Sequence, residues 1–204
     1  MSSKDWFRNE TWNEAIEAEF RVRLKRARDK AQYLRIQATH LTARHPEAAL
    51  RLLDEYFAMD PTFDRAQAYV DRAEAELALG QPDRAIASFE QAIAWQANHS
   101  NVRTNAARKL AVLIADRRIV ARYAEAMTLL DQQGPTLFPI EDYEIGAARA
   151  LILRDVDRMA EAKQAAERAV AAAAREHSGL RYHAKLGLVE DNRFGERLRE
   201  ILKA

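Results

Sequence analysis

The stretch that decides the fold is residues 66–97, AQAYVDRAEAELALGQPDRAIASFEQAIAWQA. Two antiparallel helices approach each other closely only where the facing side chains are small, and Ala73 and Ala85 are the small residues expected at that contact. Larger side chains are expected in the grooves on either side of it: Tyr69, Phe89 and Ile93. The stretch therefore predicts a helix, a tight turn and a second helix packed against the first.

This unit resembles a tetratricopeptide repeat, a helix-turn-helix motif with a period of about 34 residues. The residues that carry the resemblance are Ala73 in the first helix, Leu79 and Gly80 at its end, and Ala85, Phe89 and Ala92 in the second helix. The resemblance implies an all-α fold, a tetratricopeptide-like α-solenoid of antiparallel helix hairpins, with an N-terminal helix before the repeats and a C-terminal capping helix after them. It also implies that the protein binds another protein or a peptide.

Composition agrees with a helical, globular chain. The 204 residues are 48% hydrophobic with only 6 Gly and 5 Pro, which favours few breaks between helices, and the length suits one domain. A net charge of +1 gives no overall attraction to nucleic acid or to anionic membranes. The absence of Cys excludes disulfides and thiolate chemistry, and no apolar run is long enough for a signal peptide or a membrane span. We therefore expect a cytoplasmic protein.

Weaker repeats are expected on both sides of the clear unit, so that repeats cover residues 45–176 of a single domain spanning 1–204. Pro46 opens a helix over 47–59, which reads as the second helix of an earlier repeat. A 34-residue step from Ala73 places Ala107 in a further first helix, from roughly residue 100 to 115. The matching second-helix alanine is Ala126, about two turns late, which predicts an insertion around 116–122. Beyond Pro139, residues 140–154 and 156–176 predict one more hairpin.

The two ends of the chain are expected to cover the outer repeats. Residues 1–11 form an N-terminal arm whose Trp6 and Phe7, together with Trp12, we interpret as a lid over the first helices rather than a partner's anchor. Residues 12–44 carry one apolar stripe that fits either one long helix or two, and Thr11 with Glu14 suggests a capping box at its start. Residues 177–204 predict two short capping helices, 180–188 and 194–202.

No catalytic motif is present. The sequence has no Gly-rich phosphate loop and no nucleophile elbow, and its histidine pairs, His40 with His45 and His177 with His183, straddle helix boundaries instead of sharing a helix face. Carboxylates are abundant, but on helical repeats they usually solvate outer faces. We therefore predict that the protein is not an enzyme and needs no metal or other cofactor.

The predicted partner-binding residues follow from the resemblance, because the first helices of tetratricopeptide repeats line the face that receives a partner. By that alignment they are Gln67, Glu74, Asn101, Asn105 and Arg108. Their amide, carboxylate and guanidinium groups suit a peptide backbone and charged side chains. The family's variant that clamps a terminal carboxylate needs Lys and Asn where this chain has Val70 and Glu74, so a receptor of that kind is disfavoured.

Three functions remain open from the sequence. The favoured one is a non-catalytic scaffold or adaptor that binds a protein or peptide. A dedicated inhibitor or immunity-type binding protein is an alternative, and so is a nucleic-acid binder that uses basic clusters at 21–30 and 103–122. No aromatic side chains alternate with these clusters as single-strand binding requires, which makes nucleic acid the weaker alternative.

Overall fold

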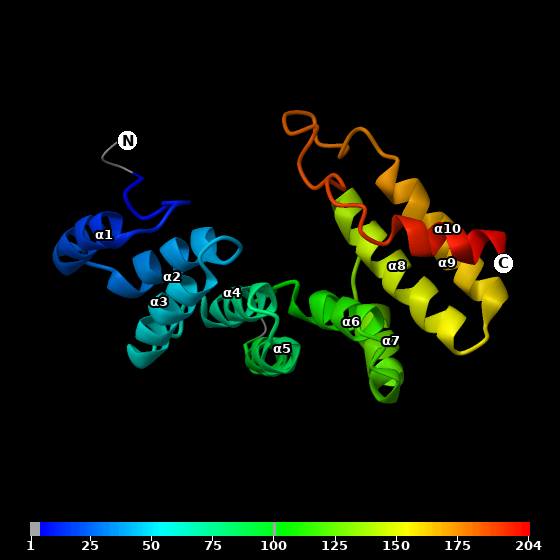
Figure 1. The fold of residues 1–204 in the computed structure, drawn as a ribbon, viewed down its shortest axis with the longest axis horizontal. Coiled ribbons are helices and arrows are strands. Elements are labelled where there is room, and N and C mark those ends of the chain that lie inside the picture. The colour runs from blue at the N-terminus through cyan, green and yellow to red at the C-terminus, as the bar shows by residue number, and fades with distance from the viewer. Residues whose placement is uncertain (1–4, 100) are drawn as a thin grey trace. The chain divides into compact units, whose positions relative to one another are not determined.

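The computed structural model describes residues 5–99 and 101–204, and this part of the chain is helical without any strand (Figure 1). The helices are α1 (Glu14–Arg26), α2 (Lys30–Leu41), α3 (Pro46–Ala58), α4 (Arg65–Ala78), α5 (Pro82–Ala97), α6 (Ala106–Asp116), the short 3-10 helix η1 (Val120–Arg122), α7 (Tyr123–Asp131), α8 (Pro139–Asp155), α9 (Met159–Ala173) and α10 (Gly195–Lys203). The predicted all-α class is confirmed.

The chain divides into two compact units, residues 1–106 and 107–204. In the first unit, α2 pairs with α3 and α4 pairs with α5, while α3 also packs on α4. In the second unit, α8 pairs with α9. Consecutive helices thus form hairpins, as the repeat pattern predicts.

The clear unit folds as the sequence indicates. The α4–α5 hairpin turns at Gly80, whose φ of +69° is a left-handed conformation that favours glycine, and Pro82 opens α5. Ala73 and Ala85 are both fully buried, as is Phe89. Small side chains on the inner faces therefore let these two helices pack closely.

The stripe over residues 12–44 forms two helices, which settles the alternative left open by the sequence. The break follows Arg26, and Asp29 caps α2 by accepting a hydrogen bond from the Gln32 amide at 3.2 Å. The capping box expected at Thr11 is wrong, because Asn13 caps α1 and accepts from the Ile16 amide at 3.0 Å. A helix begins at the residue whose side chain satisfies its first free N–H groups.

The aromatic residues of the N-terminal arm cover the first helices. The rings of Trp6 and Phe20 are 5.4 Å apart, those of Phe7 and Tyr33 4.7 Å, and Trp12 also contacts Phe20. The lid interpretation is therefore confirmed.

Helix α6 begins later than the repeat step predicts. A helix was expected from roughly residue 100, but α6 begins at Ala106, whose amide donates to the Thr104 hydroxyl at 3.2 Å. Thr104 thus stops the helix from extending backward, as a short side-chain cap does. The predicted insertion corresponds to a turn at Arg118, with φ of +54°, followed by η1, and Ala126 is fully buried on α7.

Helices α8 and α9 of the second unit approach each other closely at Gly146. A Cβ atom there would lie 3.0 Å from the Ala165 carbonyl oxygen and from the Ala169 amide nitrogen. Glycine is therefore required by the approach of the two helices, and α10 packs on the same hairpin.

Only one of the two predicted C-terminal helices forms. Residues 180–188 contain turns and no helix, so that prediction is wrong. Gly179 and Gly187 both have positive φ, and the Gly187 carbonyl accepts a hydrogen bond from the Ile140 amide at 2.9 Å. The Tyr143 hydroxyl donates to Asn192 and accepts from the Phe194 amide, both at 2.9 Å. Tertiary hydrogen bonds to α8 thus hold the chain between α9 and α10 and override the local helix preference.

Candidate functional site

Two of the predicted partner-binding residues, Gln67 and Asn101, line one cavity of about 550 Å³. The cavity lies between the segment leading into α4 and the segment that follows α5. Its remaining lining residues are Thr62, Phe63, Asp64, His99, Val102, Arg103 and Thr104. We call it the α4–α5 cavity. Hydroxyl, amide, carboxylate and guanidinium groups surround an exposed phenyl ring, which is the mixture that binds a peptide main chain together with one apolar side chain.

The walls of the α4–α5 cavity are fixed by hydrogen bonds at the end of α5 and of α3. The Thr104 amide donates to the Gln96 side chain, and the Val102 amide donates to the His99 carbonyl at 2.9 Å. On the other wall, the Phe63 carbonyl accepts from the buried Tyr56 hydroxyl. Burial, with Asp64 nearby, raises the pKa of Tyr56 to about 12, so this hydroxyl keeps its donor proton at neutral pH.

Gln67 links the α4–α5 cavity to a buried carboxylate between α2 and α4. Asp71 is 1% exposed, and its carboxylate accepts from Gln67 at 3.0 Å and from the Thr39 hydroxyl at 2.7 Å. Arg35 bridges Asp71 at 3.2 Å and Asp64 at 3.1 Å. Burial raises the pKa of Asp71, although the donors from Thr39, Gln67 and Arg35 oppose that shift. The network holds the first turns of α4 against α2.

The other predicted residues lie elsewhere. Glu74 is half-buried on α4 and does not line the cavity. Asn105 precedes α6 instead of lying on it, and its buried Oδ1 has no hydrogen-bond partner among the described residues. Arg108 belongs to the second unit, is 7% exposed, and pairs with Glu141 at 3.0 Å and Glu144 at 3.1 Å. The expected row of Asn101, Asn105 and Arg108 on one helix face therefore does not form.

Many side chains of the two basic clusters are neutralised within their own units. Arg21 pairs with Glu17 and Glu55, and Arg23 pairs with Glu19 at 2.7 Å. In the second cluster, Arg118 pairs with Asp155 at 2.9 Å and Arg122 with Glu125 at 2.7 Å, besides the paired Arg108. Neighbouring Asp and Glu side chains thus reduce the positive charge that the two clusters could offer to a nucleic acid.

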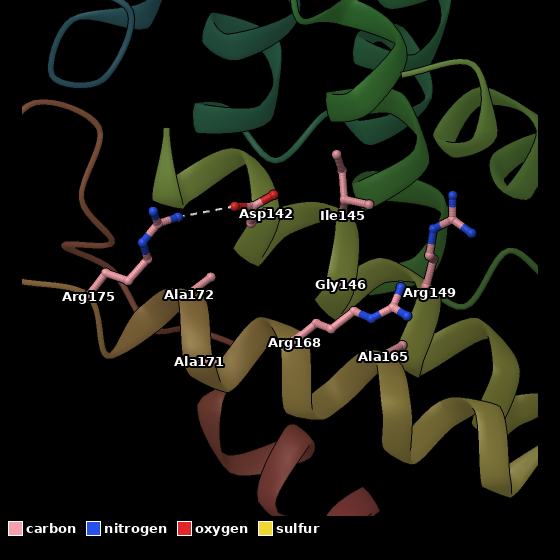
Figure 2. A pocket seen from close by; sticks show the side chains of 9 residues that line it. All are labelled: Asp142, Ile145, Gly146, Arg149, Ala165, Arg168, Ala171, Ala172 and Arg175. Carbon is pink, nitrogen blue, oxygen red and sulfur yellow. Dashed lines mark hydrogen bonds and ion pairs between the residues drawn. The ribbon is translucent and has the colours of Figure 1, made fainter. Parts of the chain in front are cut away.

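A second cavity, of about 710 Å³, lies along the α8–α9 hairpin and was missed by the sequence analysis. Asp142, Ile145, Gly146 and Arg149 line it from α8, Ala165, Arg168, Ala171 and Ala172 line it from α9, and Arg175 lines it from just beyond the end of α9 (Figure 2). We call it the arginine groove. The signal in the sequence is the seven-residue spacing of Arg168 and Arg175 with alanines between them, a spacing that predicts one shared side where the chain is helical.

Comparison with known proteins identifies the family of the central segment. The tetratricopeptide repeat family model matches residues 40–110, from the end of α2 into α6. Residues 40–110 are tetratricopeptide-like repeats. All residues that line the α4–α5 cavity lie inside this match, whereas the arginine groove lies outside it. The resemblance inferred from Ala73, Gly80 and Ala85 is therefore confirmed.

No curated protein and no solved structure matches the chain significantly. Within residues 5–99 and 101–204, no group of three or more histidine and acidic side chains is arranged to hold a metal ion. In the same part of the chain, none of the helices is long and apolar enough to cross a membrane.

Proposed function

We propose that this chain is a non-catalytic, cytoplasmic scaffold that binds a protein or peptide in the α4–α5 cavity of its tetratricopeptide segment. The observation that carries the proposal is the position of that cavity, because its whole lining falls within the matched residues 40–110. Tetratricopeptide repeats are interaction modules, whose stacked helices present binding surfaces.

The lining favours an extended segment of a partner. Thr62, Gln67 and Asn101 carry hydroxyl and amide groups that can pair with a peptide main chain. Phe63 is 69% exposed beside them and offers a contact for an apolar side chain. Asp64 and Arg103 supply opposite charges at the rim, which suits a segment of mixed charge and disfavours a polyphosphate.

Two observations distinguish the two alternative functions: the kind of molecule that binds the protein, and how strongly its affinity depends on salt. A dedicated inhibitor is a binder of one target, and it would use the same cavity in a tight stoichiometric complex. A nucleic-acid binder would depend on the exposed Arg28 and its neighbours in the 21–30 cluster, and its affinity would fall steeply with salt.

The experiment compares two matched charge reversals in the full chain, Arg103→Glu and Arg28→Glu. Both arginines are exposed, and neither has an ion pair within the described residues. Proteins captured from the native cytosol by the wild-type chain are identified, and the affinity of each purified candidate is measured. Arg103→Glu should weaken binding of the partner by about 1.5–3 kcal/mol, while Arg28→Glu should leave the binding free energy unchanged.

Loss of binding with Arg28→Glu alone, together with co-eluting nucleic acid and a steep salt dependence, would move the function to nucleic acid. Equal affinity of both variants and the wild type for the partner would show that the α4–α5 cavity is not the binding site.

A further inference from the structure

The arginine groove is charged at its ends and apolar along its floor. Arg175 and Asp142 lie at one end, joined by an ion pair of 3.3 Å. At the other end, the Arg168 side chain runs from α9 toward Arg149 on α8 (Figure 2). Between the ends the floor consists of Ile145 with Gly146, Ala165 and Ala172, and the small residues keep it shallow and open.

The two arginines at the Arg149–Arg168 end have no acidic partner inside the groove. Arg168 is exposed and forms no ion pair within the described residues. Arg149 pairs at 2.7 Å with Asp131 at the end of α7, but the Asp131 side chain is 63% exposed. A solvated pair of this kind contributes little and exchanges readily for another carboxylate. Asp142 and Asp131 each pair with one of the three arginines, so the groove keeps a net positive charge that Arg168 supplies.

We propose that the arginine groove binds an acidic peptide segment of a partner protein, in which a Glu or Asp side chain is followed by an apolar one. The carboxylate is held between Arg149 and Arg168, because guanidinium groups pair with carboxylates through parallel N–H donors. The apolar side chain lies on the floor formed by Ile145, Ala165 and Ala172. This site belongs to the second unit and does not depend on the α4–α5 cavity.

Charge and shape together select this occupant. A nucleic-acid strand needs a row of cations and aromatic stacking surfaces, but the groove has an aspartate at one end and no aromatic lining residue. A phosphate backbone has no apolar group to contact the floor of the groove, whereas a peptide supplies both an acidic and an apolar side chain at adjacent positions.

The test is selection of a random peptide display library on the full-length chain, with counter-selection on the Arg149→Gln/Arg168→Gln double variant. The expected peptides contain Glu or Asp next to Leu, Ile or Met. A selected peptide and its Glu→Gln counterpart are then titrated against the wild type, Arg168→Gln and the control Arg199→Gln. Arg168→Gln and the neutral peptide should each weaken binding by about tenfold to a hundredfold. Arg199 is exposed on α10 and does not line the groove, so Arg199→Gln should bind as the wild type does.

Because Arg168 forms no ion pair within the described residues, the unfolding curve of Arg168→Gln should match that of the wild type, and a weaker complex then reports lost binding and not misfolding. Selected peptides without acidic residues, or equal retention by the double variant, would overturn the proposal. So would a wild-type chain that dimerises in sedimentation while the double variant stays monomeric, since a second copy would then be the occupant. Competition by a single-stranded oligonucleotide that depends on Arg168 would also overturn it. None of these results bears on Arg103 or the α4–α5 cavity.

Discussion

Arg108 is a structural residue of the second unit, held between the carboxylates of Glu141 and Glu144. Removing its charge would leave two acidic side chains partly buried and unpaired, which is costly in a protein interior. We expect Arg108→Ala to lower the free energy of unfolding by about 3 kcal/mol in urea titrations, whereas Arg103→Ala should change it by less than about 0.5 kcal/mol. Equal stability of the two variants would mean that Arg108 is not engaged as described.

At the same scale, Asp71 should give stability a distinct pH dependence. Its pKa is raised in the folded chain, chiefly by burial, so the folded state binds the proton more tightly than the unfolded state, whose Asp pKa is 3.8. The protonated form therefore stabilises the fold fully below pH 3.8, and this contribution is lost as the pH rises through the raised pKa. The stability of the wild type relative to Asp71→Asn should increase as the pH falls from 7 toward 4 in parallel urea titrations. A difference that stays constant over that range would show that burial does not shift Asp71.

At the scale of the element, each hairpin depends on small residues at its helix contact. Ala73 is fully buried on α4, and a Cβ on Gly146 would already press against the backbone of α9. Ala73→Leu and Gly146→Leu should each cost about 1–3 kcal/mol by overpacking. The control is Ala78→Leu, because Ala78 is exposed on the same helix as Ala73. Thermal unfolding measures all three, and an Ala73→Leu chain as stable as the Ala78→Leu chain would refute the helix contact.

The capping helix α10 should be needed for the second unit. Phe194, Leu198 and Ile201 are buried where α10 packs on α9 and α8. Deleting residues 194–204 exposes that apolar face, and the truncated chain should associate in sedimentation experiments and melt at a lower temperature. Deleting only Lys203 and Ala204, which are exposed, should have neither effect. A monomeric, equally stable truncation to residue 193 would show that α10 is not a cap.

For the whole molecule, the sequence predicts the helices that local periodicity determines. It does not predict helix boundaries that depend on a single side-chain hydrogen bond or on tertiary hydrogen bonds. The hairpin at 66–97 is predictable because its alanines and Gly80 act locally. The start of α6 is not, since the Thr104 hydroxyl accepts from the Ala106 amide at the first residue of the helix, and Asn101 and Asn105 precede it. The segment 180–188 is predicted as a helix, but the bond from the Ile140 amide to the Gly187 carbonyl and the bond from the Ser178 amide to the Ala184 carbonyl accompany turns there.

The same reasoning explains which part of the candidate site was predictable. Gln67 was placed correctly on α4 by the family's helix register, and Asn101 reaches the same cavity although it lies outside any helix. The arginine groove could not be assigned from sequence, because Arg149 and Arg168 line one cavity only through the packing of α8 against α9.

The most direct test of the scaffold account is amide hydrogen exchange of the full chain with and without its captured protein partner. The account predicts slower exchange in the partner complex at residues 62–67, at residue 99 and at residues 101–104, which belong to the two walls of the α4–α5 cavity. Unchanged exchange in both segments, with protection confined to residues 21–30, would contradict it.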